Sequence, residues 1–240
     1  MSGTEVDRLE ELRSFYEKGD YMDYLLIDRC NELILKSART RDRAIEIGCG
    51  EGYSTKQLSE HFPDLEVLDA SASNLALMRS RTGRDLVVHN TLIEDFQLGR
   101  KYDNIFLMHV LEHVEDPIAC LRRLESVLGD EGQVYIAVPN CMALNRRAGL
   151  LMGLLDSYET LAPKDLLVGH RRLYTVDMLR EHCELAGLKV VAMKGIYLKP
   201  LSESQMYSLD DSAVRAFYRI GEDVPQYCAD LFAVATKKYY

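Results

Sequence analysis

The chain has 240 residues, of which 47% are hydrophobic and 28% charged. This length predicts a single domain with a large core, and the composition excludes disorder over most of the chain. The formal net charge of −9 disfavours DNA or RNA as a partner, because an acidic protein repels phosphate backbones. No run approaches the ~20 apolar residues of a membrane span, and the N-terminus lacks the apolar core of a secretion signal. Six dispersed cysteines without a CxxC pair favour reduced thiols and a cytoplasmic protein.

The first two thirds of the chain alternate between short apolar runs and helical periodicity. Helices are expected at 5–18 and 24–38, forming an N-terminal cap over residues 1–40. Strands are then expected at 44–47, 65–69, 85–89, 104–108 and 133–138, with helices at 54–62, 73–81 and 117–128. This alternation predicts an α/β fold whose doubly wound, mostly parallel sheet has helices on both faces, with a cofactor-binding core over 41–138.

The alternation ends after Val138. Residues 139–170 form a long connection with its own helix at 144–155, and we expect this insertion to be a lid over the site. The C-terminal part, 171–240, predicts a helix at 175–186 that is capped by Thr175, and strands at 188–197 and 231–236. The acidic, Tyr-rich connection between them, 202–227, reads as a second irregular lid.

A glycine-rich loop follows the first strand. Gly48, Gly50 and Gly52 have the spacing GxGxG, whereas a loop that binds the pyrophosphate of a dinucleotide has GxGxxG. Asp69 ends the second strand, where a carboxylate can accept two hydrogen bonds from a ribose diol. Either feature alone is also typical of a tight turn or a helix cap. Together they predict a site for a nucleoside without phosphates, and S-adenosylmethionine is the common cofactor of that description.

Four segments in order carry a family resemblance: AIEIGCGEG, VLDAS, YDNIFLMHVLEHVEDP and QVYIAVPN, extended by residues 169–190. They resemble the class I S-adenosylmethionine-dependent methyltransferases, and are similar to the branch with ubiquinone-biosynthesis-type and small-molecule tailoring O-methyltransferases. The resemblance implies a seven-stranded sheet whose last two strands form an antiparallel hairpin.

The resemblance also implies roles for individual residues around the cofactor. The three glycines would approach the methionine moiety, Glu46 would orient its amine, and Asp69 would bind the ribose. The remaining cofactor-binding candidates are Ala70, Ser71, Ile93 and Glu94 near the adenine, and Tyr16 and Tyr21 as a cover. The register of the acidic residue stays open between Glu94 and Asp95.

Two histidines after the fourth strand are the candidate catalytic residues. Methylation of a neutral hydroxyl needs a base, and His109 and His113 are suited to this because the ordinary pKa of histidine is near neutrality. A structural role for His113 and an anionic acceptor that needs no base are the alternatives. Residues 109–113 also spell HxxEH, a zinc-protease signature when it lies on one helix. A strand running into His109, with Asp116-Pro117 close behind, argues against that helix, so we expect no metal.

The acceptor is expected beside the ends of the later strands. The candidates that would bind it are Asn140, Arg146, His170, Arg171, Arg172 and Tyr174. Adjacent arginines favour a small-molecule substrate with an anionic group. Solvated charges at a helix start are the alternative, but the helix dipole is unfavourable for cations there, which favours a functional role for at least one of the two. The sequence therefore predicts methyl transfer to a small molecule, most readily at oxygen, by a monomer or homodimer. Methylation at nitrogen or carbon, and a cofactor-binding module without turnover, are the alternatives.

Overall fold

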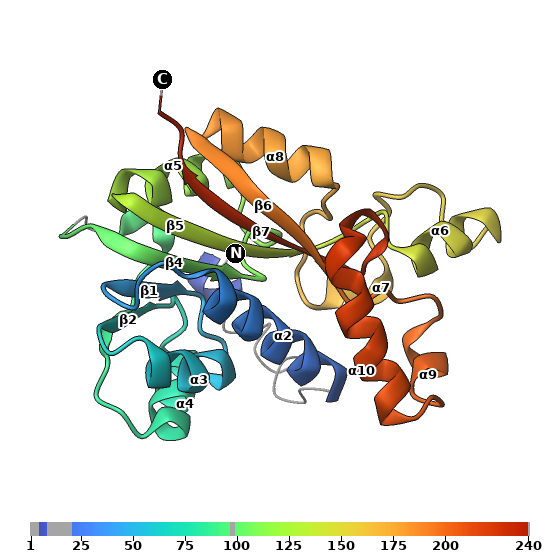
Figure 1. The fold of residues 1–240 in the computed structure, drawn as a ribbon, viewed down its shortest axis with the longest axis horizontal. Helices are drawn as coiled ribbons and strands as arrows, with labels where there is room; N and C mark the ends of the chain where they lie inside the picture. Colours follow the sequence, from blue (N-terminus) through green and yellow to red (C-terminus); the bar gives the residue numbers. More distant parts are fainter. Residues whose placement is uncertain (1–4, 9–20, 97–98, 240) are drawn as a thin grey trace.

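The computed structural model describes residues 5–8, 21–96 and 99–239 and contains one seven-stranded sheet (Figure 1). The strand order is β3-β2-β1-β4-β5-β7-β6. The strands are β1 Ala44–Ile47, β2 Leu65–Leu68, β3 Val87–His89, β4 Tyr102–Met108, β5 Leu128–Pro139, β6 Leu188–Ile196 and β7 Asp230–Lys237. Strands β1 to β5 pair in parallel, whereas β7 is antiparallel to both β5 and β6. The predicted α/β class and its antiparallel C-terminal pair are confirmed.

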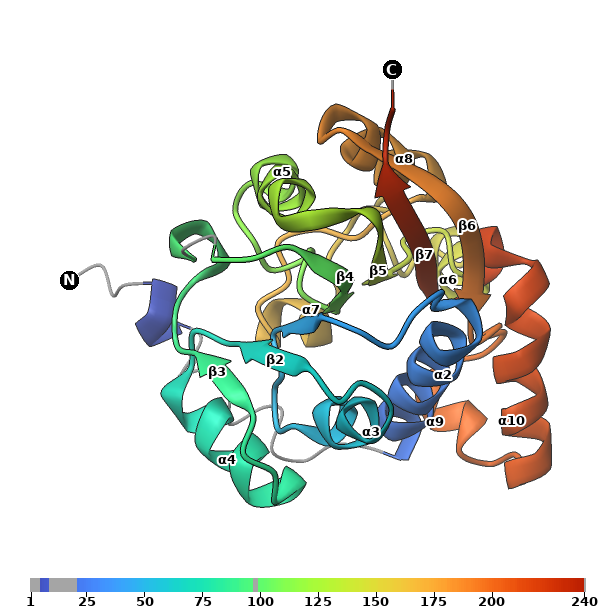
Figure 2. The same ribbon diagram turned by 60° about the vertical axis from the view of Figure 1, so that its left-hand side comes forward.

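Helices cover both faces of this sheet (Figure 2). They are α2 Tyr21–Ser37, α3 Tyr53–His61, α4 Ala72–Thr82, α5 Pro117–Val127, α6 Leu144–Leu151, α7 Pro163–Leu167, α8 Val176–Leu185, α9 Glu203–Met206 and α10 Asp211–Ile220. One core cluster joins α5 and α8 to the sheet, and a second joins α2, α3 and α10 to the opposite face. The sheet is therefore a buried central layer.

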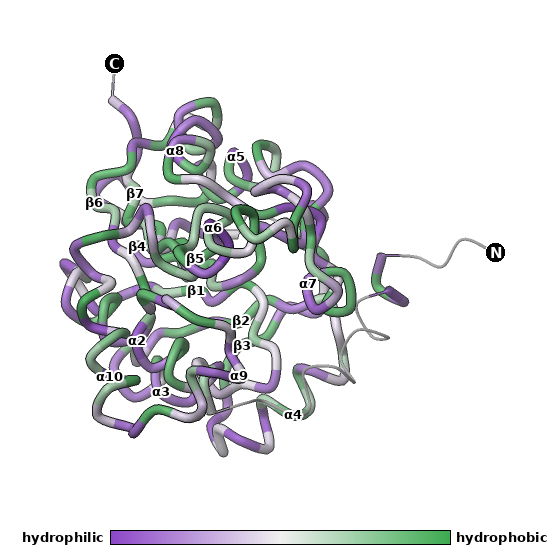
Figure 3. Tube along the Cα trace, turned by 90° about the vertical axis from the view of Figure 1, so that its right-hand side faces the viewer, coloured by the Kyte–Doolittle hydropathy of each residue, from purple (hydrophilic) through white to green (hydrophobic). Residues whose placement is uncertain are grey.

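Alternating side chains along the strands explain why two cores form. Ile105 and Leu107 of β4 belong to the cluster with α5 and α8, whereas Phe106 between them belongs to the cluster with α2. Because both faces are covered, central strands such as β5 and β7 contain continuous buried apolar runs rather than an alternating pattern. Residues 231–235 of β7, for example, take the hydrophobic colour throughout (Figure 3).

The strand directions bring several loops to one edge of the sheet. Parallel strands β1, β2, β4 and β5 end at this edge. Strand β6 ends there too, because β7 is antiparallel to both β5 and β6, so that β6 runs in the same direction as β5. For the same reason β7 begins at this edge, with Asp230 opposite Pro139 and Ile196. Ligands of doubly wound sheets bind at the carboxyl ends of the strands.

Two expectations outside the sheet need correction. The stretch 202–227 is not irregular, because α9 and α10 form within it, each capped by a side chain, Ser202 and Asp210 respectively. The insertion helix ends at Leu151, and a second short helix, α7, follows it. The predicted cap of α8 is confirmed, since the Thr175 hydroxyl accepts a hydrogen bond from the Met178 amide at 3.0 Å. In the described part of the chain no helix has the length and apolarity to cross a membrane.

Candidate active site

A cavity of about 980 Å³ opens at this edge of the sheet. One half is lined by the loops after β1 and β2 and by the segment before α5. The other half is lined by the ends of β4, β5 and β6, the start of β7, and residues of α2, α10 and the insertion. We refer to these as the cofactor half and the acceptor half.

The three glycines of the first loop have three different structural reasons. All have positive φ, at 75° for Gly48, 49° for Gly50 and 79° for Gly52, where L side chains are strained. A Cβ on Gly48 would lie 2.6 Å from Val110, and one on Gly52 would lie 2.6 Å from the Cα of Met78. A Cβ on Gly50 would meet nothing within 4 Å. Gly48 and Gly50 line the cavity, while Gly52 lets α3 and α4 pack closely.

Asp69 holds the first two loops together and faces the cavity. One carboxylate oxygen accepts from the amide of Cys49 at 2.9 Å and the other from the amide of Ser71 at 2.8 Å. Burial raises its pKa, although these amide donors favour the charged form. A carboxylate has about four acceptor positions, so capacity for hydroxyl donors remains. Ser71 itself is 1% exposed and caps α4 by accepting from the Asn74 amide.

Glu46 lies beneath the glycine loop, as the resemblance implies. It is 2% exposed and accepts a hydrogen bond from Thr55 at 2.6 Å. Burial raises its pKa to about 7, against the opposing effect of Thr55. The ammonium group of an amino acid moiety bound there would favour the charged form of Glu46, because it would compensate the buried negative charge.

The segment after β3 shows which of the two acidic residues, Glu94 or Asp95, lines the cavity. Ile93 and Glu94 line the cavity together with Ala70, whereas Asp95 does not. This position favours Glu94 over Asp95 as the residue that meets the adenine. Tyr16 and the side chain of Tyr21 lie outside the described residues. The cover that α2 does provide includes Tyr24, whose ring packs on Tyr53 with centroids 4.5 Å apart.

His109 directly follows β4 with the strained positive φ of 55°, and it lines the acceptor half. Its Nδ1 lies 3.2 Å from Oε1 of Glu112, which is fully buried. Its Nε2 has no nitrogen or oxygen partner among the described residues. Burial lowers the pKa of His109, but the thiol of Cys30 and the carboxylates of Glu112 and Asp230 outweigh this and raise it well above its ordinary value. The arrangement is a cavity-lining histidine oriented by a carboxylate, with its second nitrogen buried and the Cys30 thiol close by.

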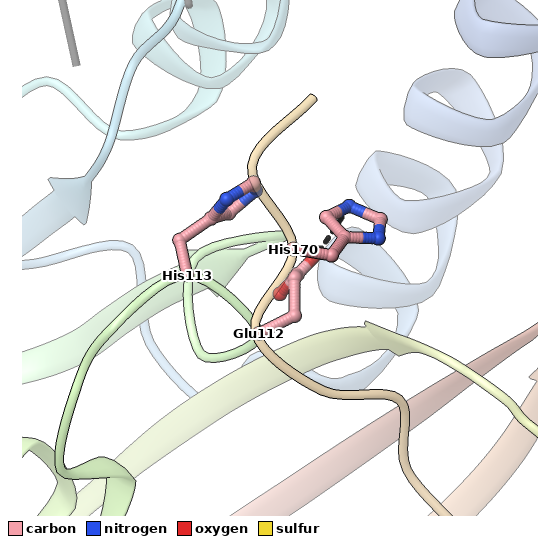
Figure 4. A group of neighbouring side chains, drawn as sticks. All are labelled: Glu112, His113 and His170. Atoms are coloured by element: carbon pink, nitrogen blue, oxygen red, sulfur yellow. Dashed lines mark ion pairs between the residues drawn. The ribbon is translucent and has the colours of Figure 1, made fainter. Parts of the chain in front are cut away.

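His113 and His170 gather around the same carboxylate (Figure 4). Ligand atoms of Glu112, His113 and His170 all lie within 4.8 Å of one another, which is the spacing of a cation site. Each already has a protein partner, however, including His109 for Glu112, Asp165 at 3.2 Å for His170 and the Gly169 carbonyl for His113. Burial lowers the pKa of His113. Residues 109–113 form a bend and a turn after β4, so the helix that the zinc-protease signature requires is missing.

The two adjacent arginines that were predicted to bind the acceptor make contacts within the protein instead. Arg172 donates to three carbonyls of the loop 111–115, and Arg171 binds another of them and Glu5. Neither arginine lines the cavity, nor does Tyr174, which is fully buried and donates weakly to the same loop. Carbonyl oxygens thus compensate these cations at the start of α8, and their positions do not support substrate binding.

The other acceptor candidates do line the cavity. Arg146 has its charge compensated by Asp165 at 3.6 Å and by two backbone carbonyls. The Asn140 amide ties the end of β5 to the loop before β7, donating to Cys228 at 2.8 Å. Only His170 keeps a position from which it faces both Glu112 and the cavity.

Among the lining residues that the sequence did not predict are Cys30, Tyr197 and Asp230. Tyr197 follows β6 with a positive φ of 63°, is 3% exposed, and has a hydroxyl without a partner among the described residues. Asp230 is 7% exposed at the start of β7. A signal for Asp230 existed, because an antiparallel last strand must begin at the edge where the parallel strands end. Nothing local marked Cys30 or Tyr197.

This sheet order, with a glycine loop after the first strand and a buried carboxylate after the second, defines a class I S-adenosylmethionine-dependent methyltransferase. A family model described as a methyltransferase domain matches residues 19–193, and the chain belongs to that family. S-adenosylmethionine is its cofactor. The cofactor half fits this molecule, since Gly50 leaves open space beside the loop and Asp69 and Glu46 face that space with buried carboxyl groups.

Relatives in sequence belong to this class, and a solved structure shares the fold. The ubiquinone biosynthesis O-methyltransferase of Dinoroseobacter shibae is 30% identical over 183 residues, covering 73% of this chain and 71% of the relative. The enzyme of the same name from Aeromonas salmonicida is 29% identical, covering 67% and 68%. The N-methyltransferase NodS from Bradyrhizobium japonicum, solved with S-adenosyl-L-homocysteine, superimposes with a TM-score of 0.62 over 99% of this chain and 100% of its own at 15% identity.

Proposed function

We propose that this methyltransferase methylates a hydroxyl group of a small molecule, with His109 as the general base and Glu112 as the residue that positions it. The observation that carries the proposal is a cavity-lining imidazole whose Nδ1 is held by the buried Glu112, while its buried Nε2 has no nitrogen or oxygen partner among the described residues. The O-methyltransferase relatives support oxygen as the methylated atom.

Each residue has a defined task in this proposal. When bound, S-adenosylmethionine supplies a methyl group that its sulfonium already activates. His109 accepts the proton of the acceptor hydroxyl at Nε2, and Glu112 stabilises the imidazolium that results. The walls of the cavity exclude water and hold the acceptor in line, which lowers the barrier through proximity.

The pH dependence has a definite sign. His109 acts as a base only when it is unprotonated, and its pKa is raised. Turnover is therefore expected to rise with pH through a value well above that of free histidine. The stabilising His109–Glu112 ion pair is fully present below the ordinary histidine pKa and is lost as pH rises through the raised one.

The test is methyl transfer from labelled S-adenosylmethionine to a panel of phenols and alcohols. His109→Gln is expected to lower turnover about 10²- to 10⁴-fold, the usual range for a lost base, with affinity for S-adenosylhomocysteine within about twofold. His61→Gln, at the exposed end of α3, is the matched control. Undiminished turnover in His109→Gln would refute the base, and a label found on nitrogen would refute the oxygen assignment while leaving the transferase class intact.

We also propose a cytoplasmic setting and a biosynthetic role. All six cysteines are buried free thiols, which suits a reducing compartment. The biosynthetic role rests on the relatives of ubiquinone biosynthesis.

A further inference from the structure

Asp230 is a buried carboxyl group that the proposed chemistry leaves unused. It begins β7 between the ends of β5 and β6, lines the acceptor half of the cavity and is 7% exposed. Its side chain makes no hydrogen bond or ion pair with any residue that the structure describes. Because its oxygens are not sealed from the cavity either, they are directed at the space that a ligand would fill.

The charged neighbours in the acceptor half are already compensated. Lys199 lies 3.0 Å from Glu203, and Lys164 lies 3.1 Å from the same carboxylate. Arg146 faces Asp165, and His109 faces Glu112. Among the described residues, Asp230 therefore has no cation within ion-pair distance, although the positive charges of His109 and Lys199 act on it from further away. A buried charge of this kind is costly unless a ligand brings a hydrogen-bond donor.

Two aromatic side chains line the cavity together with this carboxyl group. The rings of Tyr197 and Tyr218 stack with centroids 4.2 Å apart and an interplanar angle of 6°. Burial and the negative charge of Asp230 raise the pKa of Tyr218. The Tyr197 hydroxyl is buried without a partner among the described residues. Strain at a non-glycine residue such as Tyr197 is typical of functional sites. Aromatic faces next to a carboxylate suit a group that carries a positive charge or an O–H donor.

We propose that Asp230 is a specificity-determining residue, which accepts a hydrogen bond from an ammonium or hydroxyl group of the acceptor and rejects acceptors with a carboxylate at that place. This inference rests on the proposed function, because it concerns the acceptor of the same reaction. It replaces the expectation of an anionic substrate, since the arginines on which that expectation depended are compensated by the protein.

The protonation state of Asp230 gives the inference a second readout. Burial raises its pKa to about 6, against the lowering effect of His109 and Lys199. The charged and titratable groups around it are His109 and Glu112 after β4, His170 before α8, Lys199 after β6, Tyr218 on α10 and Cys228 before β7. Recognition of a cation by the carboxylate is therefore present above about pH 6 and is lost below it.

The experiment measures binding of three phenols to the chain loaded with S-adenosylhomocysteine, by calorimetry at pH 7.5. The probes are 4-(aminomethyl)phenol, 4-(hydroxymethyl)phenol and 4-hydroxybenzoate, which differ only in the group offered to Asp230. The wild type is expected to bind the first two at least tenfold more tightly than the third. Asp230→Asn should reduce this difference to about twofold or less, while Asp230→Glu should keep it. Asp223→Asn, which removes an exposed charge outside the cavity, is the control.

The pH series separates recognition from a structural effect. Wild-type affinity for 4-(aminomethyl)phenol should fall as pH is lowered from 7.5 to 5, and the fall should be absent in Asp230→Asn. Unchanged discrimination in Asp230→Asn, a preference of the wild type for 4-hydroxybenzoate, or binding of none of the probes would overturn the inference. Labelled methyl transfer by the wild type distinguishes the two proposals, because transfer to a hydroxyl with unaltered preference in Asp230→Asn overturns this inference alone.

Discussion

The two halves of the cavity are built in different ways. In the cofactor half the polar groups have protein partners, such as the amides of Cys49 and Ser71 on Asp69 and the hydroxyl of Thr55 on Glu46. In the acceptor half Nε2 of His109 and the hydroxyl of Tyr197 are buried without a nitrogen or oxygen partner among the described residues, and both backbones are strained. In the first half the protein thus satisfies these polar groups, whereas in the second half it leaves two buried polar atoms without such a partner.

Among the variants that test this difference between the two halves, Gly52→Ala is expected to have the largest effect on the free energy of unfolding. The Gly52→Ala methyl group would lie 2.6 Å from the Cα of Met78 at a φ of 79°. Backbone strain of about 1–2 kcal/mol and overpacking of about 1–3 kcal/mol predict a loss of roughly 3 kcal/mol in the free energy of unfolding. Denaturant unfolding followed by circular dichroism measures it. Gly50→Ala, with open space around its Cβ, should lose only about 1 kcal/mol. Equal losses in the two variants would contradict this account of the loop.

Asp69 tests whether the cofactor half binds as a prebuilt site. Asp69→Ala removes a charged acceptor and is expected to weaken S-adenosylhomocysteine binding at least tenfold, from bonds worth about 1.5–3 kcal/mol. Calorimetry measures it, with Asp64→Ala, a half-exposed carboxylate of the Arg100 ion pair, as the control. Unchanged affinity would refute the ribose assignment.

Asp230 tests how much a buried carboxylate in the acceptor half lowers the free energy of unfolding. Its folded-state pKa is raised to about 6 from 3.8, so the unfolded chain releases this proton more readily and stability falls as pH rises between these values. Asp230→Asn is therefore expected to increase the free energy of unfolding by about 1–3 kcal/mol at pH 7.5, at ~1.4 kcal/mol per pKa unit. The gain should vanish near pH 4. A variant less stable than the wild type at pH 7.5 would show that Asp230 has a structural partner.

The smallest effect is expected at the stacked tyrosines. Tyr197→Phe removes a hydroxyl without a partner, so the free energy of unfolding should stay within about 0.5 kcal/mol. Tyr218→Phe removes a hydroxyl that donates to the Met22 carbonyl at 2.8 Å and should cost about 1 kcal/mol. Thermal unfolding of the two variants side by side measures the difference, and a larger loss in Tyr197→Phe would reverse the assignment.

The sequence predicted what depends on neighbours in the chain. The GxGxG loop, Asp69 after β2 and the Thr175 cap are local patterns, and their places in the structure follow from strand order. The sequence did not predict the contacts of Arg171 and Arg172, because a pattern of charges does not show that backbone carbonyls of the loop 111–115 will accept their hydrogen bonds. The acceptor half draws on α2, β4, β6 and β7, so its residues come together only through tertiary packing. Asp230 was within reach of topology, but the strain at Tyr197 was not.

The position of β7 has a consequence for how the molecule assembles. The last strand in chain order lies between β5 and β6, so β6 has no place in the sheet until β7 has been inserted. Such long-range pairings form slowly, because loop closure precedes the contacts that reward it. Strands β1 to β5 can meanwhile associate through consecutive crossovers, and they carry the glycine loop and Asp69. We therefore expect the nucleoside pocket to form first during folding and the acceptor half to form last, when Asp230 at the start of β7 reaches its place between β5 and β6.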